Sequence, residues 1–133
     1  MKRGQGVFCI FENAKSTPSP FHIEQIKQAL GIAAVSCETS SWRSVKSLPG
    51  VQVDLLIDRK DGIINLCEMK YSKAEYAITK KEEEQLRNRI AAFEAEARTK
   101  KAVHLTMVTT YGITRNSHAD IVQSEVKLED LFC

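Results

Sequence analysis

The sequence predicts an α/β fold with a mixed central sheet flanked by helices. Residues 21–32 have apolar positions at helical spacing, and three strand-like runs follow them between residues 34 and 72. A long amphipathic segment then precedes a fourth β-rich run that begins at Ala102. The order helix, three strands, helix, strand is typical of a sheet covered by helices, and 133 residues are most simply one domain.

The composition is that of a globular domain with its own core, since 43% of the residues are hydrophobic and 27% are charged. No apolar run approaches the roughly 20 residues of a membrane-spanning helix. Glu12 and Asn13 interrupt the apolar stretch near the N-terminus, which makes it a poor secretion signal. The four scattered cysteines favour reduced thiols over disulfides or structural zinc. We therefore expect a cytoplasmic protein without a membrane partner.

The first predicted helix is FHIEQIKQALGI, with Ile23, Ile26 and Leu30 on one face and Gly31 as its stop signal. The preceding residues, 1–20, contain the loop-like AKSTPSP and are interpreted as an N-terminal extension. The domain proper is therefore expected at 21–133. Its first strand is predicted at about residues 34–42.

The next run, VQVDLLID, alternates and predicts a second strand. Its two expected faces are Val51, Val53, Leu55 and Ile57 on one side and Gln52, Asp54, Leu56 and Asp58 on the other. Residues 60–62, Lys-Asp-Gly, suit a hairpin loop that leads into the third strand, IINLCEMKYS. The three strands together predict an antiparallel meander.

The segment TKKEEEQLRNRIAAFEAEARTKK predicts a long helix, which Thr79 and Glu82 begin as a capping box. Its apolar positions are Leu86, Ile90 and Phe93. The helix is long enough for a right-handed parallel crossover to a fourth strand at about 102–110. Residues 114–122 are expected as a loop leading into a short edge strand, and KLEDLF as a turn of helix or an extended tail.

Charged residues inside the predicted hairpin raise a question about function, because a buried charge must be paired or bind a metal. A three-residue loop at 60–62 sets a register that places Asp54 directly opposite Glu68. The same register sets Gln52 opposite Lys70, which shares a strand face with Glu68. The sequence thus predicts that Asp54, Glu68 and Lys70 converge on one patch of the sheet.

This patch has the chemistry of a metal-dependent phosphodiester hydrolase. Carboxylates whose Cβ atoms are about 5 Å apart repel each other unless a proton or cation lies between them. Mg²⁺ or Mn²⁺ suits such oxygen ligands, and a neighbouring lysine neutralises a phosphate or orients an attacking water. The alternative is an ordinary surface salt bridge, and a register slip of one residue would separate the two acids.

Asp54 followed after thirteen residues by Glu68-Met69-Lys70 resembles the D…ExK motif of the PD-(D/E)XK nuclease superfamily. The resemblance implies the restriction-endonuclease-like fold, whose core order is αβββαβ. The strings IKQALGI, SSWRS, LRNRIAAF and KKAVHLTMVTTYGI extend it from about Ile23 to the C-terminus. Together they resemble the nuclease-like C-terminal domain of bacterial AAA-type ATP-binding proteins.

The resemblance implies roles for individual residues. Asp54 and Glu68 would ligate the metal with help from the Met69 carbonyl, and Lys70 would be the catalytic lysine. Members of the superfamily often add a glutamate from the first helix. Glu12, in an FEN string that AKSTPSPF separates from the helix, and Glu24 are the candidates for that glutamate. Val53 stands where the superfamily's name has a proline.

Basic and aromatic residues follow the motif and predict a nucleic-acid surface. They are Lys73, Tyr76, Lys80 and Lys81. A net charge of +2 is too small to indicate nucleic-acid binding by itself, so these residues are equally typical of a solvated helix entrance. Gln52 is a further candidate, either for holding water or phosphate or as a solvated strand residue.

The expected function is a Mg²⁺- or Mn²⁺-dependent nuclease, either endonuclease or exonuclease, that acts on DNA. The chain contains no nucleotide-binding P-loop, so an ATPase would be a separate partner or a missing domain. A nuclease that cuts both strands would need two sites, which makes a homodimer possible. The rival hypothesis is a catalytically inactive nuclease-fold module for protein or nucleic-acid interaction.

Overall fold

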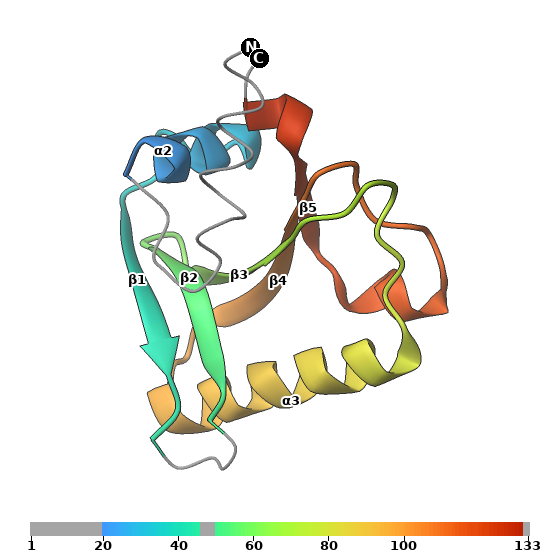
Figure 1. Cartoon of the computed structure of the whole chain (residues 1–133). Helices are drawn as coiled ribbons and strands as arrows, with labels where there is room; N and C mark the ends of the chain where they lie inside the picture. The colour runs from blue at the N-terminus through green and yellow to red at the C-terminus, as the bar shows by residue number, and fades with distance from the viewer. Residues whose placement is uncertain (1–19, 46–49, 132–133) are drawn as a thin grey trace.

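A computed structural model describes residues 20–45 and 50–131 and has a five-stranded sheet with helices on both faces (Figure 1). The elements in chain order are α2 (Pro20–Ala29), β1 (Cys37–Arg43), β2 (Gln52–Arg59), β3 (Ile63–Lys70), α3 (Lys80–Ala97), β4 (Ala102–Thr109), the 3-10 helix η1 (Ser117–Ile121), β5 (Ser124–Lys127) and the 3-10 helix η2 (Leu128–Leu131). The predicted α/β class with a mixed sheet is confirmed. None of the described helices is long and apolar enough to cross a bilayer.

The helix α2 ends at Ala29, and Gly31 terminates it as the stop signal that the sequence predicts. This glycine has a φ of 74° and donates its N–H to the Gln28 carbonyl at 3.0 Å. Ile32 donates to the Lys27 carbonyl at 2.9 Å, which completes a Schellman cap. Glycine is suited to this position because a left-handed conformation costs it little. The chain can therefore turn sharply from α2 towards β1.

The strands β1, β2 and β3 form the predicted antiparallel meander. The loop between β2 and β3 is Lys60-Asp61-Gly62, and the φ of 95° at Gly62 shows why a glycine suits its last position. The β2–β3 register pairs Leu55 with Cys67 and Asp58 with Ile64. This is the register that the three-residue loop predicts.

The helix α3 connects β3 to β4, and these two strands are parallel. Thr79 caps the helix by accepting a hydrogen bond from the Glu82 N–H at 3.2 Å, as expected from a capping box. The Glu82 side chain instead accepts from the Tyr76 hydroxyl at 2.8 Å. The expected edge strand is β5, which pairs in parallel with β4 and follows the helix η1.

The core lies on both faces of the sheet, and Figure 1 shows α2 and α3 on opposite sides of it. The α2-side cluster of buried residues is Ile23, Ile26, Ile32, Leu55, Ile57, Cys67, Val108, Val126 and Leu131. The α3-side cluster is Val53, Leu56, Ile64, Leu66, Ile78, Leu86, Phe93, Leu105 and Ile121. Phe93 of α3 also makes a T-shaped contact with Trp42, with ring centroids 5.4 Å apart. A charged side chain that points from the sheet towards α2 or towards α3 therefore has apolar neighbours.

Candidate active site

Asp54 lies at an irregularity of β2. The β1–β2 register shifts by one residue between Ser40 and Trp42, and there Asp54 and Leu55 together stand opposite a single β1 residue. This is a β-bulge, which breaks the alternation of side chains along a strand. Val53 consequently belongs to the α3-side cluster while Leu55 belongs to the α2-side cluster. The prediction that Val53 and Leu55 share a face is therefore wrong.

The Asp54 carboxylate is half-buried and held by a neighbouring amide. Gln52 Nε2 donates to Asp54 Oδ1 at 3.0 Å, and Gln52 Oε1 accepts from Arg43 Nη2 at 2.9 Å. Burial raises the pKa of Asp54 above its ordinary value, the Gln52 hydrogen bond lowers it, and the Glu68 charge raises it further. Gln52, which the sequence places on the same strand face as Asp54, is thus its hydrogen-bond partner in the structure.

Glu68 lies on β3 with its side chain only 15% exposed. Its Oε1 is 3.4 Å from Lys70 Nζ, and its Oε2 accepts a hydrogen bond from Arg89 Nη1. The positive charges of Arg89 and Lys70 also act on Asp54, where both lower the pKa. The structure therefore brings Asp54, Glu68 and Lys70 into one electrostatic cluster, as the sequence predicts, and adds Arg89 to it.

Arg89 is the member of the cluster that sequence reasoning missed. It lies on α3, three residues after the buried Leu86 and four before the buried Phe93. That spacing places it beside the inward-facing stripe of the helix. An arginine at the edge of an apolar stripe, with an acidic residue predicted on the facing sheet surface, is the signal that could have identified it.

A narrow crevice lies beside Glu68, Lys70 and Arg89. It measures about 20 Å³, which is room for about one water molecule. The residues around it are Glu68, Lys70, Tyr76, Glu82, Gln85, Leu86, Arg89 and Met107. The Tyr76 hydroxyl donates to Glu82, and burial followed by this hydrogen bond raises the Tyr76 pKa, so the phenol stays protonated. Tyr76 therefore forms part of the crevice wall.

The donor chemistry of the cluster fits a hard divalent cation. Asp54 and Glu68 offer carboxylate oxygens, and the negative charge of Glu68 raises the pKa of Asp54. Within residues 20–45 and 50–131 no three His, Cys, Asp or Glu residues gather as a metal-ligand group. A cation here would rely on two carboxylates and keep several waters, which is the usual habit of Mg²⁺. In this structure the Arg89 guanidinium is bound to Glu68 Oε2.

The other sequence candidates lie in different places. Glu12 lies outside the described residues. Glu24 is exposed on α2, across the sheet from the cluster, with its carboxylate 3.6 Å from Lys27 Nζ. The Met69 side chain packs against the α2-side cluster, so only its backbone can belong to the site. The structure thus does not bring Glu24 to Asp54 and Glu68.

The predicted nucleic-acid residues surround the entrance to α3. Lys73 is exposed in the connection from β3. Lys80 and Lys81 are exposed in the first turn of α3, directly before Glu82, which lines the crevice. Three exposed ammonium groups therefore lie on the chain segment that borders the crevice beside Glu68.

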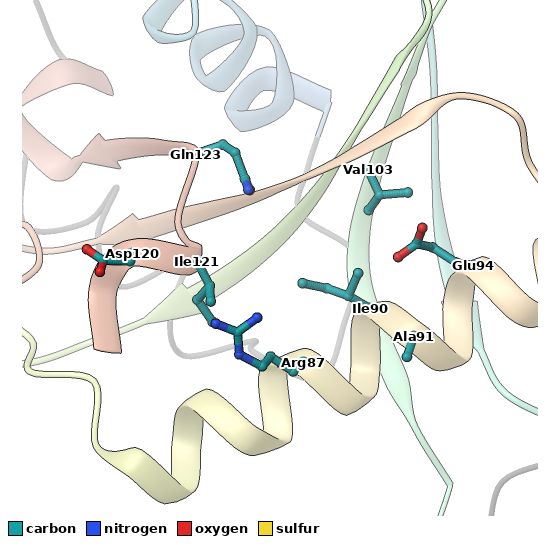
Figure 2. A pocket seen from close by; sticks show the side chains of 8 residues that line it. All are labelled: Arg87, Ile90, Ala91, Glu94, Val103, Asp120, Ile121 and Gln123. Atoms are coloured by element: carbon teal, nitrogen blue, oxygen red, sulfur yellow. The ribbon is translucent and has the colours of Figure 1, made fainter. Parts of the chain in front are cut away.

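A larger hollow, of about 430 Å³, lies elsewhere, between α3 and the segment around η1 (Figure 2). Its lining is Arg87, Ile90, Ala91, Glu94, Val103, Asp120, Ile121 and Gln123. Figure 2 shows Ile90, Ile121 and Val103 on the three segments around this hollow, together with the charged side chains Arg87, Glu94 and Asp120. None of the three D…ExK residues lines this hollow, so it is separate from the cluster around Glu68.

The comparisons with known proteins concern the fold. Neither a family model nor a curated protein sequence matches this chain. One similar solved structure is the crystal structure of a protein of unknown function, AF1548, with a TM-score of 0.55 and 12% sequence identity over 84% of this chain. This chain covers 64% of the length of that protein. The likeness supports the α/β architecture and carries no functional assignment.

Proposed function

We propose that this chain is a metal-dependent nuclease domain that hydrolyses DNA phosphodiester bonds. The observation that carries the proposal is the convergence of Asp54, Glu68 and Lys70: Lys70 Nζ is 3.4 Å from Glu68 Oε1 on β3, and the β2–β3 register brings Asp54 beside them. These three residues are the D…ExK set on which the resemblance to PD-(D/E)XK nucleases rests. A half-buried carboxylate whose pKa is raised by burial and by a second carboxylate is typical of functional sites.

Each residue has a specific role in the proposed reaction. Asp54 and Glu68 would hold Mg²⁺ or Mn²⁺, with the backbone carbonyl of Met69 as a further oxygen donor. When bound there, such a metal would supply Lewis-acid chemistry, activating a water and stabilising negative charge on the phosphate. Lys70 orients the attacking water and offsets negative charge from beside Glu68. Gln52 keeps the Asp54 carboxylate in place through its 3.0 Å hydrogen bond.

DNA is the proposed substrate because cationic groups border the crevice beside Glu68. Lys73, Lys80 and Lys81 are exposed where a phosphate backbone would pass the crevice. Tyr76 is an unsuitable stacking platform in this conformation, because its ring packs in the core and its hydroxyl is bonded to Glu82. Backbone contacts rather than base contacts are therefore expected to dominate binding.

The test is cleavage of single- and double-stranded DNA by the purified chain in Mn²⁺ or Mg²⁺, compared with EDTA. Glu68→Gln should reduce the rate by at least about a hundredfold. Glu38→Gln is the matched control, since Glu38 is an exposed β1 residue 4.0 Å from Lys60, and it should leave the rate unchanged. Cleavage that survives Glu68→Gln would locate the activity elsewhere or in a contaminant.

A second candidate function is a catalytically inactive module that docks an AAA-type ATPase or another protein. The observation that favours it is the pairing of Glu68 with both Arg89 and Lys70, which satisfies this carboxylate without a metal. Calorimetry separates the two functions. Mn²⁺ binding that Asp54→Asn abolishes supports the nuclease, whereas a folded protein that binds no Mn²⁺ supports the inactive module.

A further inference from the structure

Arg89 occupies the position of a cation beside the proposed metal ligand. Its guanidinium donates to Glu68 Oε2, and its side chain is 27% exposed. Lys70 is on the other oxygen of the same carboxylate, at 3.4 Å. Glu68 thus has a positive partner on each of its two oxygens, while Asp54 adds a second negative charge to the cluster.

Arg89 also borders the free space next to Glu68. Arg89 and Glu68 both line the crevice, whose 20 Å³ hold about one water molecule. Mg²⁺ usually keeps several waters, so a hydrated ion on the crevice side of Glu68 would need more room than one water molecule occupies. Arg89 can move aside, because its side chain is partly exposed and has a long flexible stem. Lys70 is more exposed still, but it has its own role beside Glu68 in the proposed reaction. Glu68 and Leu86 are held by the sheet and by the core.

Other charges on the same helix do not duplicate this arrangement. Arg87, two residues earlier, is bound to Glu83 with Nε and Oε2 2.8 Å apart, and its side chain is 60% exposed. Glu83 also bonds His118 Nδ1 at 2.8 Å. Arg87 is therefore occupied by a surface ion pair, while Arg89 is the α3 arginine that contacts Glu68.

We propose that Arg89 exchanges partners during the reaction, from Glu68 in the metal-free protein to the phosphate of DNA when a divalent cation takes Glu68. Guanidinium binds carboxylate and phosphate with the same fork of N–H groups, so it suits both states. The exchange makes metal binding and DNA binding depend on each other. Arg89 is then a phosphate-binding residue of the site, and this inference rests on the proposed function.

The exchange predicts opposite effects of one substitution on two affinities. Without the Arg89 guanidinium, a metal no longer has to displace a positive charge from Glu68. The repulsion between the Glu68 and Asp54 carboxylates is also less compensated, which favours a cation between them. Arg89→Gln should therefore bind Mn²⁺ about fivefold more tightly. The same variant loses a charged phosphate contact and should bind DNA about tenfold more weakly. A merely structural role would weaken both affinities or neither.

The experiment titrates Mn²⁺ into the full chain by calorimetry and measures binding of a labelled DNA duplex in Ca²⁺ by fluorescence anisotropy. The variants are Arg89→Gln, the matched control Arg87→Gln from the same helix, and Glu68→Gln. Arg89→Met, which keeps an unbranched stem, replaces Arg89→Gln if circular dichroism shows that the latter is unfolded. Arg87→Gln should leave the Mn²⁺ affinity unchanged.

Tighter Mn²⁺ binding together with weaker DNA binding in the Arg89 variant would establish the exchange. If wild-type protein binds Mn²⁺ in a Glu68-dependent manner but the Arg89 variant binds it no more tightly, the exchange is refuted and the nuclease proposal stands. If no variant binds Mn²⁺, or if Glu68→Gln leaves binding intact, the proposed metal site fails and the exchange fails with it.

Discussion

Asp54→Asn is predicted to make the metal-free protein more stable at neutral pH. The pKa of Asp54 is raised in the folded state, chiefly by burial. A raised carboxyl pKa means that the folded protein disfavours the charged form, so ionised Asp54 destabilises the fold. Asparagine removes the charge and keeps an oxygen that can accept the Gln52 hydrogen bond.

The magnitude follows from the environment of the carboxylate. Asp54 is half-buried, and the charges of Arg89 and Lys70 and the Gln52 amide partly offset its burial. After a discount for solvent screening, we expect a gain of about 0.5 kcal/mol in the free energy of unfolding. For a chain of this size that corresponds to a rise of about 2 °C in Tm.

The sign of the pH dependence is fixed by the direction of the pKa shift. Below the ordinary pKa of 3.8, Asp54 is protonated in both folded and unfolded states, and the variant has no advantage. As the pH rises through the raised pKa of the folded state, wild-type protein loses stability relative to the variant. The gain should therefore be complete at pH 7.5 and shrink as the pH approaches 4.

The assay is thermal unfolding in EDTA at several pH values, with Asp58→Asn as the control from the same strand. Asp58 Oδ1 is 2.5 Å from Lys101 Nζ, and loss of this surface pair should destabilise the fold by about 0.5 kcal/mol. Opposite signs for the two substitutions are the expected result. Destabilisation by Asp54→Asn at pH 7.5 would refute the reasoning and make Asp54 a structural residue.

Two further predictions concern the elements that position the site. Phe93→Ala should destabilise the fold by about 3–4 kcal/mol, because it leaves a cavity in the α3-side cluster and removes the T-shaped contact with Trp42. Denaturant unfolding followed by tryptophan fluorescence measures it, and a loss below about 1 kcal/mol would contradict the packing. Thr79→Ala should cost about 1 kcal/mol by removing the 3.2 Å N-cap bond to Glu82, whereas Thr79→Ser should retain most of the stability in the same assay.

The parts of the fold that the sequence predicts correctly are governed by neighbours along the chain. Gly31 ends α2 and Thr79 begins α3 because the glycine conformation and the threonine cap are decided within a few residues. The three-residue loop ending at Gly62 similarly sets the β2–β3 register. That register, which turn chemistry alone predicts, suffices to place Asp54 and Glu68 near each other.

The features that sequence reasoning missed depend on contacts between distant segments. The β-bulge at Asp54 arises from the pairing of β2 with β1, and strict alternation along β2 gives no sign of it. Glu24 is a plausible site residue by its position in the first helix, yet α2 packs on the opposite face of the sheet. Which face a helix covers is decided by the packing of the whole chain.

By itself, the sequence determined the α/β class, the presence of the two main helices, the hairpin and the acidic pair with its lysine, because each follows from local periodicity or turn chemistry. Only the tertiary structure decided that Arg89 meets Glu68. These residues are 21 positions apart, on a helix and a strand whose relative rotation is set by burial of Leu86 and Phe93 against the sheet. The local pattern places Arg89 at the edge of the apolar stripe of α3, but which acidic residue it meets follows from three-dimensional packing.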